Sequence, residues 1–259
     1  MKWKRFKKEN KSIKRILVPI ILLIFISIII YTGIKIFNWL KENKQSREIM
    51  KEISEAVIIN DDKQNIDNGE NANKYNIEFE SLKQKNENTV AWLKVNGTNV
   101  EYPVVRTNNN DYYLTHTFDK TYNSAGWIFM DYKNKLDGNE KNIVIYGHNR
   151  KDGSMFGTLK NILTEEWQNI EDNLIIPLID ENEKANYRVF SVYKIEQEDY
   201  YISTKFSTDN EFQKFIDKIK SRSVKDFGIN VSKEDQILTL STCADNNKYR
   251  EVLHAKKIK

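Results

Sequence analysis

The chain has 259 residues, of which 39% are hydrophobic, 30% charged and 12% aromatic, a composition typical of a folded protein rather than a disordered one. Its net charge of +4 is unevenly placed: residues 1–15 contain six Lys, two Arg and one Glu and so carry +7, which leaves −3 for the other 244 residues. The folded part therefore has no basic field, and this argues against nucleic acid as a partner.

An uncharged apolar run from Ile16 to Ile34 follows the basic segment. Its 19 residues, at 1.5 Å each in a helix, span about the 30 Å hydrocarbon core of a bilayer. A cleaved signal peptide would have a shorter apolar core and a small-x-small cleavage site, whereas this run continues into Phe37 and Trp39, which suit the membrane interface. We therefore expect an uncleaved signal anchor over residues 16–40, with residues 1–15 in the cytoplasm and the bulk of the chain outside it.

The segment between this anchor and the folded domain divides into two parts. Residues 41–59 carry apolar side chains at spacings of three and four, which predicts an amphipathic helix just outside the membrane. Asn60 to Lys74 is polar and predicts a linker or exposed loop. We therefore assign residues 41–74 to a juxtamembrane helix and linker, and residues 75–259 to the folded domain, which should begin with a short helix from about Glu78 to Lys85.

From Thr89 onward the pattern changes to short apolar strands. Two such runs, 90–95 and 100–105, flank the dipeptide Asn96-Gly97, which is a strong hairpin signal. Further strands are expected near 126–131, 142–147, 173–179, 186–195, 236–243 and 250–257. Many short strands with few helices favour a closed or nearly closed β-barrel over a βαβ sheet.

Two helices are expected to interrupt these strands. The segment from Ser154 to Leu163 gathers its apolar side chains on one side of a helix, and a second helix begins at the capping box Thr208-x-x-Glu211. Three scattered histidines and one cysteine are too few for a zinc site, so we expect no metal and no cofactor.

The only cysteine, Cys243, ends the strand expected over 236–243. One cysteine cannot form an intramolecular disulfide, and its plainest interpretation is a small buried hydrophobe. A catalytic interpretation needs a base or a cation nearby, because a thiol with a pKa of about 8.5 is mostly protonated at neutral pH.

Three histidines could supply that base. His148 follows an apolar strand that ends on Gly147, so it is well placed for a cleft. His254 alternates within its strand, which favours a packed side chain, and His116 lies in a polar loop, which favours exposure to solvent. Spacing alone does not choose among them. Arg250 follows on the next strand and could hold the anion formed when a thiolate attacks a carbonyl, although an exposed arginine in a weak surface pair is the plainer interpretation.

Several segments of the chain resemble the sortase family. Three of them match its catalytic motifs: Thr239-Leu240-Ser241-Thr242-Cys243, Tyr146-Gly147-His148-Asn149, and Arg250. Four more are similar to class B sortases in particular: Thr89-Val90-Ala91-Trp92-Leu93, Tyr102-Pro103-Val104-Val105, Asn110-Asp111-Tyr112-Tyr113-Leu114 and Ile128-Phe129-Met130-Asp131. The resemblance covers about residues 75–259. It implies a mainly β fold, an eight-stranded sortase β-barrel with N-terminal helices and a helix near 209–222 before the cysteine strand, behind the transmembrane helix.

The resemblance also implies a cysteine transpeptidase. Cys243 would attack the carbonyl of a Thr within a sorting signal near the C-terminus of a secreted protein. His148 would protonate the leaving amine and then deprotonate the incoming one, and Arg250 would hold the substrate and stabilise the oxyanion. An amine of a peptidoglycan precursor or cross-bridge would resolve the thioacyl enzyme. By the same resemblance, the substrate groove would be lined by Asn110, Leu114, Tyr201, Ile202 and Ser241.

Two features depart from many relatives, and two other functions stay open. Ala244 follows the cysteine where an acidic residue is common, with Asp245 next, so the role of an acidic residue there is open. The loop from Cys243 to Arg250 is short, which bears on the register of Arg250. A thiol peptidase that hydrolyses the same thioacyl intermediate, or a membrane-tethered domain that binds wall components without chemistry, would share most of these sequence features.

Overall fold

The computed structural model describes residues 2–55, 57–59, 71–196, 198–243 and 248–258, with the backbone alone for residues 2–14, 57–59, Asn71 and Cys243. The chain divides into two compact units, Met1–Arg47 and Glu48–Lys259.

The first unit consists of most of helix α1, Lys2–Ser54. Its apolar side chains from Ile16 to Leu40 are exposed, and the part from Arg15 onward is long and apolar enough to cross a membrane. Pro19 lies inside the helix, and the Ser27 hydroxyl donates back to the Leu23 carbonyl four residues earlier. The helix predicted over 41–59 is therefore not a separate element, because α1 runs through without a break.

The end of the helix predicted over 41–59 is wrong. Helix α1 stops at Ser54, and the run Val57–Ile59 instead forms strand β1, which pairs antiparallel with β2, Tyr75–Ile77. Three consecutive β-branched residues favour a strand over a helix. Most of the linker predicted over 60–74 lies outside the described residues, and its last four residues form the 3-10 helix η1, Asn71–Lys74. The short helix α2, Phe79–Lys85, confirms the prediction for that segment.

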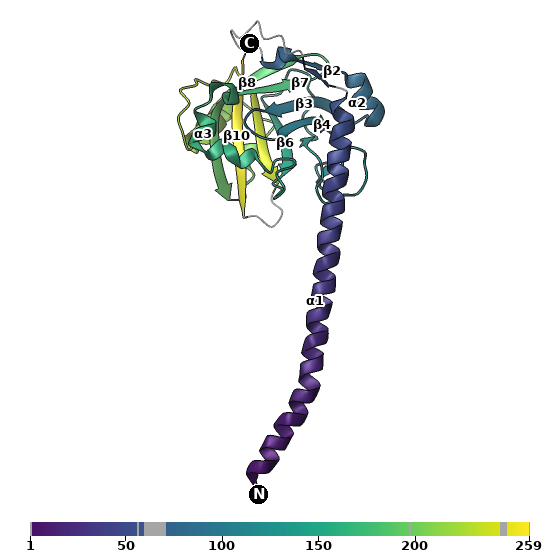
Figure 1. Ribbon diagram of the computed structural model, residues 1–259. Helices are drawn as coiled ribbons and strands as arrows, with labels where there is room; N and C mark the ends of the chain where they lie inside the picture. The colour runs from purple at the N-terminus through teal and green to yellow at the C-terminus, as the bar shows by residue number, and fades with distance from the viewer. Residues whose placement is uncertain (1, 56, 60–70, 197, 244–247, 259) are drawn as a thin grey trace. The chain divides into compact units, whose positions relative to one another are not determined.

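Eight strands of the second unit close into a barrel, in the order β10-β8-β7-β3-β4-β5-β6-β9. This confirms the predicted eight-stranded barrel. Their bounds are β3 Thr89–Val95, β4 Val100–Val105, β5 Phe129–Met130, β6 Asn142–His148, β7 Ile175–Ile179, β8 Lys184–Glu196, β9 Ile237–Cys243 and β10 Tyr249–Ile258. Figure 1 labels β3, β4, β6, β7, β8 and β10 among them. The predicted hairpin is β3–β4, whose turn carries Gly97 at a φ of +70°. Most pairs are antiparallel, but β4 and β5 run parallel, as do β6 and β9, and β9 lies between β6 and β10.

The barrel interior is filled by strand residues with almost no exposed surface, including Leu93, Ile145, Leu240 and Leu253. A second apolar cluster lies under helix α4, Asp209–Ser221, through Phe212, Phe215, Ile216 and Ile219. The predicted cap of α4 is confirmed, since the Thr208 hydroxyl accepts from the Glu211 N–H at 3.1 Å.

The helix predicted over 154–163 is wrong. Met155 has a φ of +52° and pairs with Asn149 in an isolated bridge, and helical structure begins only with η3, Leu159–Leu163. A β-carbon on Gly157 would lie 2.1 Å from the Arg150 carbonyl oxygen. The chain thus folds tightly back on the end of β6 here. This turn buries the apolar side chains whose spacing predicted a helix. The short helices α3, Glu165–Gln168, and η4, Glu171–Leu174, then lead into β7.

Candidate active site

The three candidate catalytic residues lie at the ends of three neighbouring strands. His148 ends β6, Cys243 ends β9, and the two are register partners in the parallel β6–β9 pair, where adjacent strands are about 4.8 Å apart. In the antiparallel β9–β10 pair Val252 lies opposite Ser241. Two residues further along each strand, the same register brings Arg250 level with Cys243. The fold therefore aligns the three residues in one row across β6, β9 and β10, which we call the catalytic row.

His148 is 5% exposed, and its imidazole orientation is fixed by a hydrogen bond. Nε2 lies 2.7 Å from the Leu114 carbonyl oxygen. A carbonyl can only accept, so Nε2 carries a hydrogen, and Nδ1 is the nitrogen that can gain or lose a proton. Leu114 thus contributes to this site through its backbone, whereas the sequence suggested a groove-lining side chain.

Gly126 makes room for this arrangement. It has a φ of +58°, and a β-carbon there would lie 2.4 Å from the Tyr113 carbonyl oxygen and 2.9 Å from both the Leu114 carbonyl oxygen and His148 Cδ2. Only glycine combines this left-handed backbone with such close packing against an imidazole. Sequence reasoning missed Gly126, because a single loop glycine does not indicate what lies beside it.

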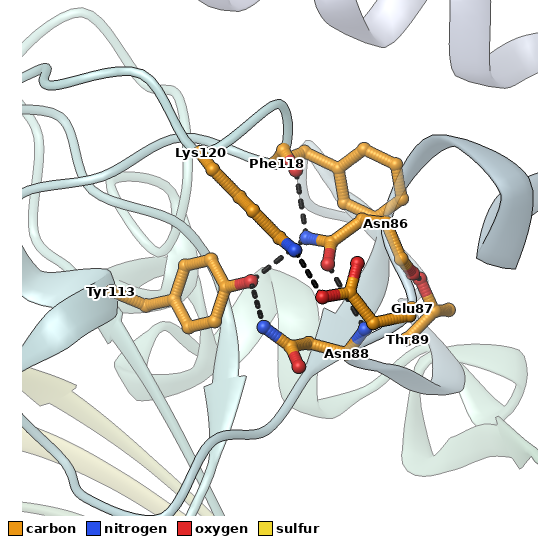
Figure 2. Close-up of polar contacts among 7 residues, drawn as sticks. All are labelled: Asn86, Glu87, Asn88, Thr89, Tyr113, Phe118 and Lys120. Carbon is orange, nitrogen blue, oxygen red and sulfur yellow. Dashed lines mark hydrogen bonds and ion pairs between the residues drawn. The ribbon is translucent and has the colours of Figure 1, made fainter.

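The loop that carries Leu114 is held by hydrogen bonds to the segment that follows α2, and Figure 2 shows those that Asn86 and Asn88 make to Tyr113 and Phe118. The buried Tyr113 hydroxyl accepts from Asn86 Nδ2 at 2.8 Å and from Asn88 Nδ2 at 3.0 Å. Asn86 Nδ2 also donates to the Phe118 carbonyl oxygen at 2.7 Å, and Asn86 is fully buried. The turn between α2 and β3 therefore holds the loop 110–127 and, through it, the carbonyl that binds His148.

Arg250 lies half-buried on β10. Its Nη1 is buried and has no hydrogen-bond acceptor among the residues that the structure describes. A buried guanidinium N–H without an acceptor is costly, so this atom suits a site in which a carbonyl oxygen or oxyanion arrives with a ligand.

The candidate groove residues occupy different positions. Tyr201, on η5 (Tyr200–Ile202), and Ser241, two residues before Cys243, share a hydrogen bond of 3.0 Å and are each 2% exposed. Ile202 is half-buried and packs against the apolar cluster that contains Tyr201. Asn110 is part-buried: its Nδ2 donates to Asp131 at 2.9 Å and its Oδ1 accepts from the Tyr132 N–H at 3.0 Å. Asp131 also accepts from the Tyr146 hydroxyl at 2.9 Å, which links Asn110 to strand β6.

The two other histidines lie outside the catalytic row. His254 is fully buried, as predicted, between the Tyr193 hydroxyl at 2.8 Å and the Thr239 hydroxyl at 2.9 Å. Its desolvation by burial lowers the pKa of His254 to about 3. The prediction that His116 is solvated needs correction: its ring stacks on Tyr112 and its Nδ1 lies 2.8 Å from the Tyr112 carbonyl oxygen, so it is partly buried.

Comparison with known proteins gives a consistent result. The Sortase domain family model matches residues 93–258. The chain is 34% identical to Sortase B of Listeria monocytogenes over 95% of this chain and 99% of that protein. Among solved structures it resembles the Staphylococcus aureus sortase B–substrate complex, with 33% identity, a TM-score of 0.66 and coverage of 86% of this chain and 95% of that one. It also resembles sortase B of B. anthracis in complex with AAEK1, with 33% identity, a TM-score of 0.72 and coverage of 85% and 99%.

Proposed function

Because this chain belongs to the sortase family, as a class B cysteine transpeptidase, we propose that it cleaves a C-terminal sorting signal after Thr and joins the protein to a cell-wall amine. The observation that carries the proposal is that His148 and Cys243 are register partners, with Arg250 brought level with them when the β9–β10 register is continued two residues past its last pair, Val252 and Ser241. The substrates are secreted proteins bearing the signal, and the acceptor is an amine of a peptidoglycan precursor or cross-bridge.

In the first half-reaction the Cys243 thiolate attacks the Thr carbonyl carbon. A sulfur–carbon bond forms and the peptide carbon–nitrogen bond breaks, while the His148 imidazolium gives its proton to the leaving amine. Arg250 donates an N–H to the carbonyl oxygen as negative charge develops on it. The buried Nη1 of Arg250 supports this role, because among the described residues it has no acceptor of its own.

In the second half-reaction the acceptor amine attacks the thioacyl carbonyl and gives a proton to His148, and the thiolate leaves. Nδ1 exchanges the proton in both steps, because Nε2 donates to the Leu114 carbonyl in the neutral and in the protonated ring. The imidazole therefore keeps one orientation throughout the cycle.

For the substrate groove we keep Asn110, Leu114, Tyr201, Ile202 and Ser241 as proposed binding residues. The hydrogen bond between Tyr201 and Ser241 supports a common wall beside Cys243. One of the similar structures is a complex of Staphylococcus aureus sortase B with a substrate, which supports a peptide ligand for this site.

We propose that the enzyme is a single-pass protein of the cell membrane, with a cytoplasmic N-terminus and an extracellular catalytic domain. Helix α1 supports this by length and composition, and the basic residues 1–15 favour the cytoplasmic side. The division stays as proposed from the sequence: residues 1–15 cytoplasmic, 16–40 membrane-spanning, 41–74 juxtamembrane and 75–259 catalytic. The anchor would hold the enzyme where exported substrates and wall precursors meet.

The test uses the full chain in detergent micelles with a library of sorting-signal peptides, with and without triglycine as the amine. We expect cleavage after Thr, a product joined to triglycine, and no product from Cys243→Ala. Hydrolysis alone in the presence of the amine would favour a thiol peptidase instead. Full activity of Cys243→Ala in cells would sink the enzymatic proposal in favour of a wall-binding domain.

A further inference from the structure

Glu251 is a buried carboxylate next to the catalytic row. It follows Arg250 on β10, is 5% exposed, and its Oε2 accepts hydrogen bonds from Thr242 Oγ1 and Asn149 Nδ2, each at 3.0 Å. Its own backbone N–H donates to Thr242 Oγ1 at 2.9 Å. Thr242 immediately precedes Cys243 and Asn149 immediately follows His148. One carboxylate thus connects the chain neighbours of all three residues of the row.

The side chain of Glu251 does not contact the reacting atoms, because those atoms lie on the face of β10 from which Arg250 projects. Side chains alternate along a strand, so Glu251 and Arg250 project from opposite faces of β10. Glu251 instead bonds to the side chains of Thr242 and Asn149, which adjoin Cys243 and His148 at two strand ends, while Glu251 itself adjoins Arg250 at the third. Strand ends are where a ladder opens most readily, and each of these ends carries a residue that the reaction needs in place.

The surroundings of Glu251 indicate that its hydrogen bonds, rather than an ion pair, are what matters. Among the described residues, the ion pair that Glu251 makes is with Lys194, whose Nζ lies 4.0 Å from Oε1 and which is half exposed. The buried carboxylate therefore bonds chiefly to the hydroxyl of Thr242 and the amide of Asn149. Buried ionic groups of this kind can often be replaced by well-packed apolar side chains without loss of stability. Fold stability therefore does not explain Glu251, whereas a role in the geometry of the active site does.

We propose that Glu251 is a positioning residue for the transpeptidase reaction. Its carboxylate holds the ends of β6, β9 and β10 in the register that keeps His148, Cys243 and Arg250 in one row. This inference rests on the function proposed above. A misplacement of about 1 Å between reacting groups costs on the order of 100-fold in rate, so even partial loss of this register would be visible in kcat.

The experiment compares Glu251→Ala and Glu251→Gln in the full chain, in detergent micelles. The substrate is a sorting-signal peptide that the wild type cleaves, and triglycine is the acceptor amine. Glu251→Ala should lower kcat by about tenfold to 100-fold while KM for the peptide changes by less than about threefold. Glu251→Gln should keep kcat within about threefold, because both side-chain bonds are made to one oxygen that an amide can supply. The matched control is Glu183→Gln, which removes the carboxylate paired with Lys257, seven residues beyond Arg250 on β10, and should leave kcat unchanged.

A second variant tests whether Glu251 and Thr242 act as one unit. Thr242→Val removes the hydroxyl that lies between the Glu251 carboxylate and backbone, and should lower kcat in the same way. The double variant Thr242→Val/Glu251→Ala should then be little worse than the poorer single variant, because residues that act together are not additive.

Two results would overturn the proposal. One is a folded Glu251→Ala enzyme with kcat within twofold of the wild type. The other is a loss that follows only the unfolded fraction, measured by circular dichroism, with normal turnover per folded molecule. A wild type that makes no product would instead refute the proposed function. In that case the alkylation rate of Cys243 by iodoacetamide still decides: it should change several-fold in Glu251→Ala and not in Glu251→Gln.

Discussion

His148 and His254 carry the same side chain in opposite surroundings. His148 ends a strand, and Nε2 donates to a backbone carbonyl, which leaves Nδ1 for proton exchange. His254 is enclosed between two hydroxyls, and the pKa of about 3 that burial gives it keeps the ring neutral at any physiological pH. A ring that stays neutral cannot serve as an acid for a leaving amine.

Replacing the two histidines by glutamine should therefore separate them. His148→Gln should lower kcat by at least about 100-fold, because proton transfer is lost, whereas His254→Gln should keep most activity as long as the barrel stays folded. Steady-state kinetics with circular dichroism as the folding control measures both. The reverse pattern would mean that His254 is the base.

His254 should also make stability depend on pH. Its pKa is lowered in the folded state from 6.5 to about 3, so between these values the unfolded chain binds a proton that the folded chain does not. The free energy of unfolding should fall as pH falls through this window, by about 1.4 kcal/mol per pH unit at most. Urea unfolding at about pH 7 and about pH 5 should show a loss of roughly 1 to 2 kcal/mol that is absent in His254→Gln. An equal loss in both proteins would count against this assignment.

Gly126→Ala tests the close packing behind the imidazole. The added β-carbon meets two backbone carbonyl oxygens as well as the imidazole, and backbone atoms cannot rotate away. We expect a drop in kcat together with a destabilisation of at least about 1 kcal/mol, seen in kinetics and thermal unfolding. The control is Gly138→Ala, which has a similar φ of +80° but nothing within 4 Å of the new atom. It should cost stability through backbone strain and leave kcat unchanged.

At the level of helices, strands and loops, the catalytic row depends on more than its own strands. A loop beside it holds His148, and that loop is held in turn by another part of the chain. The loop 110–127 contributes a carbonyl to His148 and is fixed by the turn between α2 and β3. Asn86 has three roles in that turn: it donates to Tyr113 and Phe118, and its Oδ1 accepts from the Asn88 N–H at 3.0 Å.

Asn86→Leu should loosen this loop. It leaves the buried Phe118 carbonyl without its donor, which costs about 1 to 3 kcal/mol, and leaves the Tyr113 hydroxyl with Asn88 as its donor. It should therefore raise hydrogen exchange over residues 111–118 and lower kcat. The control is Glu87→Gln, which removes the exposed Lys120–Glu87 ion pair shown in Figure 2 and should leave exchange and kcat unchanged. Unaltered exchange in Asn86→Leu would show that the loop is held by its own packing.

At the level of helices and strands, some features could be predicted from the sequence and others could not. Hydrophobic alternation and turn residues located the strands to within a few residues, and the capping box located α4, because these signals are local. The segment 154–163 misled, since its apolar spacing fits a helix while contacts of Gly157 with Arg150 and Ser154 bend the chain back. Glu251 and Asn86 could not be found, because each acts through partners more than 25 residues away or on other strands.

For the molecule as a whole, the open prediction is the membrane anchor. Replacing Leu23 and Ile26 by Lys places two charges in the middle of the expected span, each costing about 2.5 to 3.5 kcal/mol there. The wild type should remain in the membrane pellet after carbonate extraction, and the double variant should not. A wild type released by carbonate would contradict the anchor. The charge balance agrees with this division of the chain, since +7 lies in residues 1–15 and −3 in the rest.

The hydrogen bond from His148 Nε2 to the Leu114 carbonyl has a consequence for the order of events. In the proposed mechanism, a ring held in this orientation presents the same nitrogen to every amine, so the departing peptide and the arriving nucleophile compete for one position beside Nδ1. The C-terminal fragment released by cleavage must then diffuse away before the acceptor can bind. Initial velocities with both substrates varied should then give parallel double-reciprocal lines, and excess acceptor should inhibit by occupying that position too early.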